Sequence, residues 1–343
     1  MAKVIQIAPD AVNTWSTLPG NTGELNIDMS MIEDTVFGFS YKSEFPDMGN
    51  WTVNANAIYK GYAGYAVNIK QSGTSTAMTN EACTLVSGKT YQITATTKRI
   101  IDPLVAVVVK DGAVDHTADV LSIDYLAGTV TFKTAYTVTG AVTVTGNYLP
   151  TSQICAMNKY TLNMQAAAID QTDLCIAQSN GGLMQYAMGL KTVGLNLSGF
   201  YKSTSTFRAA LLARSPVIID INPDGLGNSY CRGIFVAKSD KESGKVGELE
   251  AENVEFTLYV PDNALMASPF SWVHGGSSTL NTGVRTLLAA FAAGAQVQVK
   301  YLEDGVTGKQ GNAIPVDLSL SGGKGSLNEF SVKLQGSGGL TVV

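Results

Sequence analysis

The sequence repeats itself twice, and the two repeats have different spacings. A first set of residues recurs after 162 − 25 = 137 positions, since Leu25-Asn26, Ile32 and Thr35 return as Leu162-Asn163, Ile169 and Thr172. After an apparent five-residue insertion the offset becomes 196 − 54 = 142, because Asn54, Tyr59 and Lys60 return as Asn196, Tyr201 and Lys202. This pattern predicts a duplicated strand-loop-strand unit.

A second repeat lies further along the chain. Phe207-Arg208 matches Val284-Arg285 at an offset of 284 − 207 = 77, and Asp224-Gly225 matches Asp304-Gly305 at 304 − 224 = 80. The offset of 80 continues through Ile234, Val236 and Ser239, which match Ile314, Val316 and Ser319 and lead into glycine-bearing hairpins at 242–245 and 322–325. The repeated unit is therefore a helix, a strand, an Asp-Gly turn, a strand, a hairpin and a strand.

The difference between the offsets excludes a plain head-to-tail duplication. We expect one continuous copy at 153–262 and a second copy that is split between 1–69 and 263–343. Residues 70–152 then form an insertion. The alternative is that 70–152 supplies the second half of the first copy and 263–343 is an appended third piece.

Most of the chain has the alternation and composition of β-strands. Val, Thr, Ile and Tyr are enriched in segments bounded by glycine, which favours strands at 53–60, 89–97, 104–110, 120–126, 128–133, 141–149, 216–221, 231–237, 254–260, 296–302, 314–320 and 330–336. The sequence therefore predicts a mainly β (α+β) fold, with a compact all-β module at 70–152.

Two helices interrupt this pattern. The first begins after a capping hydroxyl at Ser205 or Thr206 and ends before Pro216. The second has Thr282 as its cap and Gly294 as its stop, and Val284, Leu287, Leu288 and Phe291 repeat at i, i+3, i+4 and i+7. Each helix has one apolar stripe, so each is expected to pack on a sheet.

These features together resemble the major tail tube proteins of long-tailed bacteriophages. The resemblance depends on the Ile-x-x-Thr stretch, the strands WTVNANAIYKG (51–61) and VGLNLSGFYKS (193–203), a helix, and then a long glycine-tipped hairpin. The segment 122–150 also resembles a small β module of phage structural proteins. The resemblance implies two tail-tube-type β-sandwich units, each flanked by a helix, plus the inserted module.

The resemblance also implies how the chain assembles. Tube proteins of this family form stacked rings of six tube domains, so a chain with two such domains would close a homotrimer with pseudo-sixfold symmetry; the alternative is a homohexamer. Other partners would be tail proteins such as the tape measure, the tail terminator and the tail tip. The chain would be assembled in the host cytoplasm and reside in the virion tail, where DNA passes through the lumen without specific binding.

The charge balance agrees with such a conduit. The chain has 23 Lys and Arg against 28 Asp and Glu, a net charge of −5, with no basic block. Clustered cations would hold the DNA phosphates in place, so a neutral or acidic lining suits sliding DNA, although ordinary solubility explains a small net charge equally well. Asp220 and Asp317 are candidates for the lining.

The segment KSDKESGKVGELEAE (238–252) is charged and contains glycine. Such a composition is typical of a solvated hairpin tip, and in a tube it would also suit a contact between rings. The candidate ring-stacking loop consists of Lys241, Glu242, Ser243, Gly244 and Lys245.

The sequence contains no convincing catalytic, cofactor or metal site, and we expect none. VSGKT (86–90) resembles a phosphate-binding loop, but Cys83 stands where a glycine is needed and a strand follows instead of a helix. GVTGKQG (305–311) lacks the hydroxyl residue and is interpreted as a turn. The four cysteines are far apart and are expected to be structural thiols.

The two histidines do not indicate chemistry either. His116 lies between Asp115 and Asp119, as expected for a hairpin surface, and His274 has Ser277 and Ser278 nearby without a nucleophile elbow. Trp51 and Trp272 are expected in a core or an interface. There is no apolar run long enough for a membrane span, and the N-terminus lacks a secretion signal. Alternative functions are a β-rich phage adhesin, receptor-binding or decoration protein, or a small hydrolase.

Overall fold

The computed structural model describes residues 3–9, 14–18, 20–33, 44–58, 67–201, 207–223, 229–245, 249–274, 282–324 and 326–343. Strands dominate these segments, so the predicted mainly β class is confirmed. The chain forms two compact units. Unit 1 consists of Met1–Tyr65, Lys159–Leu195 and Gly276–Val343, and Unit 2 consists of Ala66–Asn158 and Asn196–Gly275.

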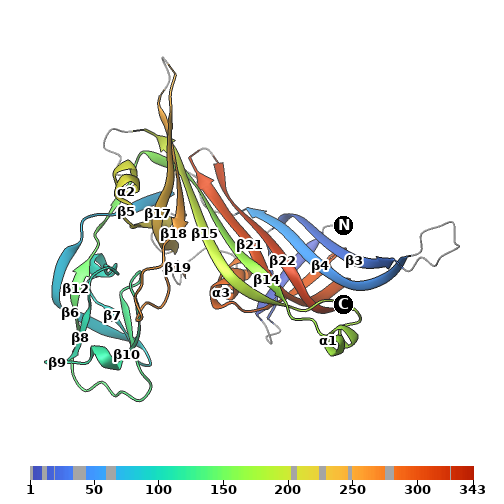
Figure 1. The fold of residues 1–343 in the computed structure, drawn as a ribbon, viewed down its shortest axis with the longest axis horizontal. Helices are drawn as coiled ribbons and strands as arrows, with labels where there is room; N and C mark the ends of the chain where they lie inside the picture. Colours follow the sequence, from blue (N-terminus) through green and yellow to red (C-terminus); the bar gives the residue numbers. More distant parts are fainter. Residues whose placement is uncertain are drawn as a thin grey trace. The chain divides into compact units, whose positions relative to one another are not determined.

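Unit 1 is built on long antiparallel strands (Figure 1). Their order is β3 (Gly20–Glu33), β4 (Glu44–Ile58), β22 (Ser326–Val342), β21 (Gly308–Gly323), β14 (Met157–Asp170) and β15 (Tyr186–Phe200). Strand β21 changes partner along one edge: its second half pairs with β14, and its first half pairs with β20 (Val297–Leu302). Beyond β20 the sheet continues through β1 (Val4–Pro9) to β2 (Ser16–Thr17).

Helix α3 (Thr282–Ala293) packs against β1, β20 and β21 of Unit 1. Its apolar stripe is buried at the predicted positions Val284, Leu287, Leu288 and Phe291. Gly294 ends the helix with φ of +71°, a conformation that favours glycine. Thr282, expected as the cap, is instead the first helical residue, and its carbonyl accepts a hydrogen bond from the Thr286 hydroxyl.

A short helix, α1 (Leu174–Ser179), lies between β14 and β15 and was missing from the sequence prediction. Asp173 caps it, because its side chain accepts a hydrogen bond from the Ile176 N–H at 2.8 Å. The signal was a capping Asp before an apolar stretch, but one turn and a half is too short to show a helical period.

Unit 2 contains a second set of antiparallel strands. The order is β15, β18 (Ala251–Leu258), β17 (Ser229–Ser243), β16 (Val217–Asn222), β5 (Asn68–Ser72) and β13 (Thr151–Gln153), while β19 (Phe270–His274) also pairs with β17. Helix α2 (Phe207–Ala213) contacts β17. Phe207 of this helix is buried edge-on against Phe256 at 5.2 Å between ring centroids. The predicted caps Ser205 and Thr206 lie outside the described residues.

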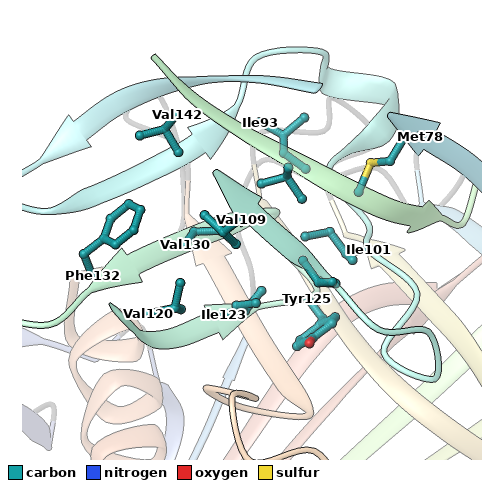
Figure 2. Close-up of a cluster of buried hydrophobic side chains, with 12 residues drawn as sticks. Met78, Ile93, Ile101, Val109, Val120, Ile123, Tyr125, Val130, Phe132 and Val142 are labelled. Carbon is teal, nitrogen blue, oxygen red and sulfur yellow. The ribbon is translucent and has the colours of Figure 1, made fainter. Parts of the chain in front are cut away.

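The segment between β5 and β13 forms its own seven-stranded sheet; five of its strands overlap predicted ones, whereas those at Thr76–Ser87 and Val114–Asp115 were not predicted. Its order is β10 (Val120–Asp124), β11 (Thr129–Phe132), β7 (Thr90–Ile93), β6 (Thr76–Ser87), β12 (Val142–Tyr148), β8 (Val108–Asp111) and β9 (Val114–Asp115). Figure 2 shows its core, in which inward side chains such as Ile93, Val109, Val130 and Phe132 are fully buried. Short 3-10 helices at Thr96–Lys98 and Thr117–Asp119 complete it.

This module is joined to the rest of Unit 2 by hydrogen bonds as well as by apolar contacts. Ile123 exchanges backbone hydrogen bonds with Leu265 and Ala267 at 2.6 and 2.9 Å. Arg232 of β17 donates to the Leu126 carbonyl. Ile218 and Ile234 are buried in one cluster with Ile100 and Leu126. Both ends of the module are anchored too, because Thr151 pairs with Ser72 and Gln153 with Lys70.

The bounds of the strands follow the sequence repeats. Strands β3 and β14 are offset by 157 − 20 = 137 at their starts and 170 − 33 = 137 at their ends. Strands β4 and β15 are offset by 186 − 44 = 142 and 200 − 58 = 142. Likewise β16 and β20 differ by 297 − 217 = 80. The predicted duplicated hairpin and the later helix-strand repeat are thus elements of the same type in the same order.

The assignment of the repeats to domains stays a prediction. Strand β4 and helix α3, which the split copy requires in one core, both belong to Unit 1. Residues Lys159–Leu195 of the expected continuous copy also belong to Unit 1, however, so the compact units do not coincide with the copies. The repeat residues Thr35, Tyr59, Lys60, Lys202, Asp224 and Gly225 lie outside the described residues.

Candidate assembly surfaces

The candidate ring-stacking loop lies at the end of the β17–β18 hairpin. Strand pairing continues as far as Ser243 and Ala251, so Lys241, Glu242 and Ser243 belong to β17 and only 244–250 connect the strands. The loop expected over 238–252 is therefore narrower than the sequence indicated, because charged residues continue the strand in register. Gly244 and Lys245 follow directly and are exposed. Residues 246–248 lie outside the described residues.

Helix α2 contacts the end of β17 next to this loop through Arg208. The guanidinium lies 2.5 Å from a carboxylate oxygen of Glu242 and 3.5 Å from one of Asp240. The Asp240 side chain is almost fully buried, and burial raises its pKa, while the nearby Arg208 opposes that rise. The ion pairs couple the direction of the hairpin to the position of α2.

Arg208 was not singled out by the sequence as a functional residue. Its only sequence signal was the match of Phe207-Arg208 with Val284-Arg285. The two arginines differ in their partners, since Arg285 donates to the Thr282 hydroxyl one turn earlier in α3. The sequence repeat therefore marked the position of Arg208. Its ion pairs with Asp240 and Glu242, which are distant in the chain, give it the role of joining α2 to β17.

Strand β3 forms a long edge of the Unit 1 sheet. Among the described residues it pairs only with β4, so its other backbone edge has no strand beside it. Toward its end Ile27, Met29, Met31 and Ile32 are each about half exposed. A long apolar edge is hazardous in a lone protein and useful in a polymer.

The lining prediction is wrong for Asp220. This carboxylate is buried and lies 2.6 Å from the Arg232 guanidinium, and it also accepts a hydrogen bond from the Asn222 amide. A buried, paired carboxylate presents no charge to a channel. Asp317 of β21 is half-buried and pairs with Gln165 of β14. Its place in the lining stays a prediction.

Two of the four cysteines, Cys83 and Cys231, lie in surroundings that disfavour the thiolate. All four thiols are free, Cys155 and Cys175 are exposed, and Cys231 is buried. Burial, with a smaller contribution from Glu81, raises the pKa of Cys83 to about 12. Burial likewise raises the pKa of Cys231. A reactive thiol needs the opposite shift, toward the thiolate at neutral pH.

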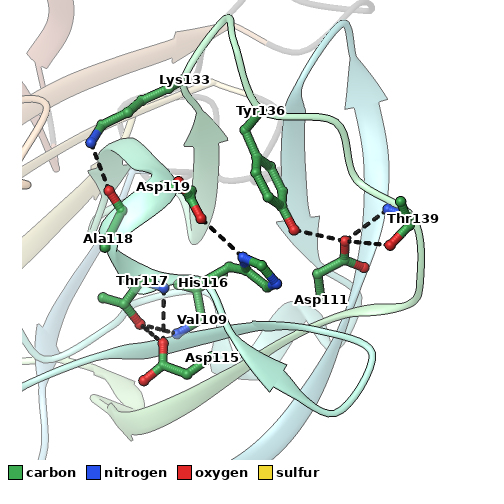
Figure 3. A network of polar contacts seen from close by, with 10 residues as sticks. All are labelled: Val109, Asp111, Asp115, His116, Thr117, Ala118, Asp119, Lys133, Tyr136 and Thr139. Atoms are coloured by element: carbon green, nitrogen blue, oxygen red, sulfur yellow. Dashed lines mark hydrogen bonds and ion pairs between the residues drawn. The ribbon is translucent and has the colours of Figure 1, made fainter.

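His116 belongs to a polar network on the surface of the module (Figure 3). Its Nδ1 lies 2.9 Å from Asp119 Oδ2, and its ring packs against Tyr136. Asp111 next to it accepts hydrogen bonds from the Tyr136 hydroxyl and from the Thr139 N–H and hydroxyl. Among the described residues no three His, Cys, Asp or Glu side chains gather as a metal-binding group. His274 ends β19, while Ser277 and Ser278 lie outside the described residues.

The segment that resembles a phosphate-binding loop is a β-turn. Gly88 has φ of +53° between β6 and β7, and Lys89 donates to the carbonyls of Thr134 and Tyr136. At Asp304-Gly305 a second turn is closed by the Asp304 carboxylate, which accepts hydrogen bonds from the Val306 and Thr307 N–H groups. The turn expected over 305–311 is therefore confirmed only up to Thr307, because β21 begins at Gly308, and no turn was predicted for 86–90.

The tryptophans occupy different environments. Trp51 is buried in Unit 1, and its indole N–H donates to the Gly338 carbonyl at 3.0 Å. Trp272 is half-buried in β19.

None of the helices described is long and apolar enough to cross a membrane.

No protein-family model matches the chain, and no curated protein matches it. Several solved structures are similar over part of it, including two from gene transfer agent particles. One is a chain from the virion of a native gene transfer agent particle, 16% identical, with 36% of this chain and 88% of that chain covered and a TM-score of 0.30. The other comes from the tail of an empty gene transfer agent particle, 15% identical, with 36% and 87% covered and a TM-score of 0.30. A likeness of this size defines neither a common fold nor a family.

Proposed function

We propose that this chain is a structural protein of a phage-like tail, in which copies of it assemble into stacked rings that form a tube for genome delivery. The observation that carries the proposal is the repetition of strands in the sheets. In Unit 1 the order is β3, β4, β22, β21, and their counterparts in the sequence repeats are β14, β15, β18 and β17. A chain made of two like sets of strands can add further copies of itself edge to edge.

The exposed edge of β3 and the charged β17–β18 hairpin support this proposal. An edge strand offers unpaired N–H and C=O groups to a neighbouring chain, and the hairpin offers a polar tip to the next ring. The resemblance of the sequence to tail tube proteins supports the same assembly. The role is structural, without catalysis and without a bound cofactor.

Electron microscopy of the purified chain tests the proposal. Negative stain should show rings or hollow tubes, and native mass spectrometry of dissociated rings should give three chains. A ring of six full chains would contradict the trimer but not the tube. Discrete monomers or compact trimers that bind host cells would instead favour the adhesin, and activity in a broad hydrolase screen would favour an enzyme.

The role of the ring-stacking loop is testable separately. Replacing 244–250 by Asn-Gly should leave the β17–β18 register intact, because this pair forms the tight turn that a two-residue hairpin needs. We expect folded chains that still form rings but no longer stack into tubes. Tubes of normal length from this variant would show that residues 244–250 do not join the rings.

A further inference from the structure

We propose that β3 of one chain pairs with β17 of a second copy, and that the pairing between β14 and β21 inside one chain gives its register. The proposal rests on the self-assembly proposed above and identifies the strands and residues that join neighbouring chains. It follows from the repeats together with the strand pairing, since one junction between the repeated halves is already present inside Unit 1.

The first step is the equivalence of the strands. Strand β14 is the counterpart of β3, with an offset of 137 at both ends. Strand β21 is the counterpart of β17, with an offset of 80 through Ile314, Val316 and Ser319. The strands that meet as β14 and β21 thus have their equivalents in β3 and β17.

The second step concerns the edges that these strands leave open. One edge of β21 pairs with β20 up to Ala313 and then with β14 from Asp317 to Gly323, while β22 occupies the other edge. Residues 231–235 of β17 likewise pair with β16. Among the described residues, 237–243 of β17 pair only with β18. Strand β3 pairs only with β4 in the same set. In the part of the chain that the structure describes, the edges joined as β14–β21 are therefore open in β3 and in β17.

The third step transfers the register. Inside Unit 1 the paired residues include Thr161 with Ser321, Leu162 with Leu320, and Asn163 with Ser319. Subtracting 137 from the first residue and 80 from the second gives Glu24 with Lys241, Leu25 with Asp240, and Asn26 with Ser239. The resulting seam is antiparallel, like the junction from which it is derived.

Charge supports this register. Glu24 and Lys241 are both exposed in the single chain, and the register places these opposite charges directly across from each other. Opposite charges at facing positions stabilise a strand pair, and like charges there destabilise it. Neither charge has a counterpart in the template pair Thr161 and Ser321, so the ion pair would be particular to contacts between chains.

Crosslinking between two different chains tests the seam. One chain carries Asn26→Cys, the other carries Ser239→Cys and a mass tag, and the exposed Cys155 and Cys175 are serine in both. Because each chain has one half of the pair, a heterodimer forms only between copies. As a control, Ser243→Cys replaces Ser239→Cys; it lies four residues along β17, roughly 13 Å away at the rise of a strand and beyond disulfide reach.

We expect oxidised assemblies to yield the heterodimer about tenfold more with Ser239→Cys than with Ser243→Cys, since a disulfide needs close Cβ atoms. If tubes form and this preference is absent or reversed, the seam is wrong and the tube proposal survives. If the cysteine-reduced parent chain forms neither rings nor tubes, both proposals fail.

Charge reversal gives a second, independent readout. Glu24→Lys and Lys241→Glu should each lower the sedimented fraction at low salt about threefold or more, through like charges across the strands. The combined variant should recover assembly, because the pair is restored in the opposite sense. Single variants that assemble like the parent, or a double variant no better than either single one, would overturn the register.

Discussion

At the scale of residues, two buried carboxylates show how their surroundings change a pKa. Asp240 lies in the β17–β18 hairpin and Asp111 in the inserted module. Asp240 and Asp111 are both carboxylates in strands with little solvent contact. Asp111 is surrounded by donors, which lower its pKa, whereas burial raises the pKa of Asp240. The two residues should consequently respond to pH in opposite directions.

For Asp111 we expect stability that disappears in acid. Hydrogen bonds led by the Thr139 N–H lower its folded-state pKa, so its contribution is present above the ordinary value of 3.8 and is lost as the pH falls through the lowered value. Asp111→Asn should cost about 2 kcal/mol near pH 7, the range for hydrogen bonds to a charged group. Urea unfolding across pH 2 to 7 should show the two curves converging at the acid end; parallel curves would contradict this account.

For Asp240 the sign is reversed. Its folded-state pKa is raised, so ionisation disfavours the folded state, and stability is lost as the pH rises from about 3.8 through the raised value. Removing the partner with Arg208→Met should destabilise the chain at neutral pH, by less than the loss of a partner in a fully buried pair because Arg208 is half exposed. Adding Asp240→Asn to that variant should restore part of the loss in urea titrations. If the double variant is less stable than Arg208→Met alone, the uncompensated charge is not the cause.

At the scale of elements, the sequence predicted strands and helices where the local pattern was strong. The stripe from Val284 to Phe291 and the Val-Thr alternation of the module were sufficient for α3 and most of the inserted sheet. Strands β3 and β14 have weaker alternation and were implied only by the repeat, whereas the end of β15 was also expected from the resemblance at 193–203. Sequence alone could not reveal which strands pair over long range, such as β22 with β4, because pairing depends on contacts distant in the chain.

One element-scale prediction concerns how closely strand β22 approaches the core. A Cβ at Gly336 would overlap the Trp51 indole, so Gly336→Ala forces the ring or the strand to shift. We expect a loss of about 3 kcal/mol in the free energy of unfolding, at the upper end for overpacking. Gly294→Ala is the matched control, since nothing lies within 4 Å of its Cβ and only its positive φ is strained, which costs about 1 kcal/mol. Equal losses for the two variants would refute the clash.

At the scale of the whole molecule, the repeats predicted the duplicated elements, and the assembly surfaces could be predicted only in part. Lys241 and Glu242 were identified from charge and glycine content, but their place in β17 and the contact of Glu242 with Arg208 required the structure. The open edge of β3 was equally invisible, because an edge is defined by the neighbours that a strand lacks. The buried ion pair of Asp220 shows why side-chain exposure could not be inferred from strand position.

The inserted module should be removable. Since β5 and β13 are neighbouring antiparallel strands, joining Ser72 to Thr151 through Asn-Gly replaces 73–150 by a hairpin turn. We expect the remaining chain to fold with reduced stability, because Ile218 and Ile234 lose the cover of Ile100 and Leu126, and we expect it to form rings. Circular dichroism and electron microscopy would check this; replacing both isoleucines by threonine controls for aggregation. A chain that stays unfolded even with these replacements would show that the module is part of one indivisible fold.

The change of partner along one edge of β21 has a mechanical consequence. The strand pairs with β22 on one edge and with β20 and then β14 on the other. Nearly its whole length is therefore hydrogen-bonded on both edges. A pull along such a strand loads its hydrogen bonds in shear, and many must rupture together, whereas a pull at the end of a hairpin opens them one by one. Strand β21 should therefore be mechanically stiff and resist tensile force along its axis.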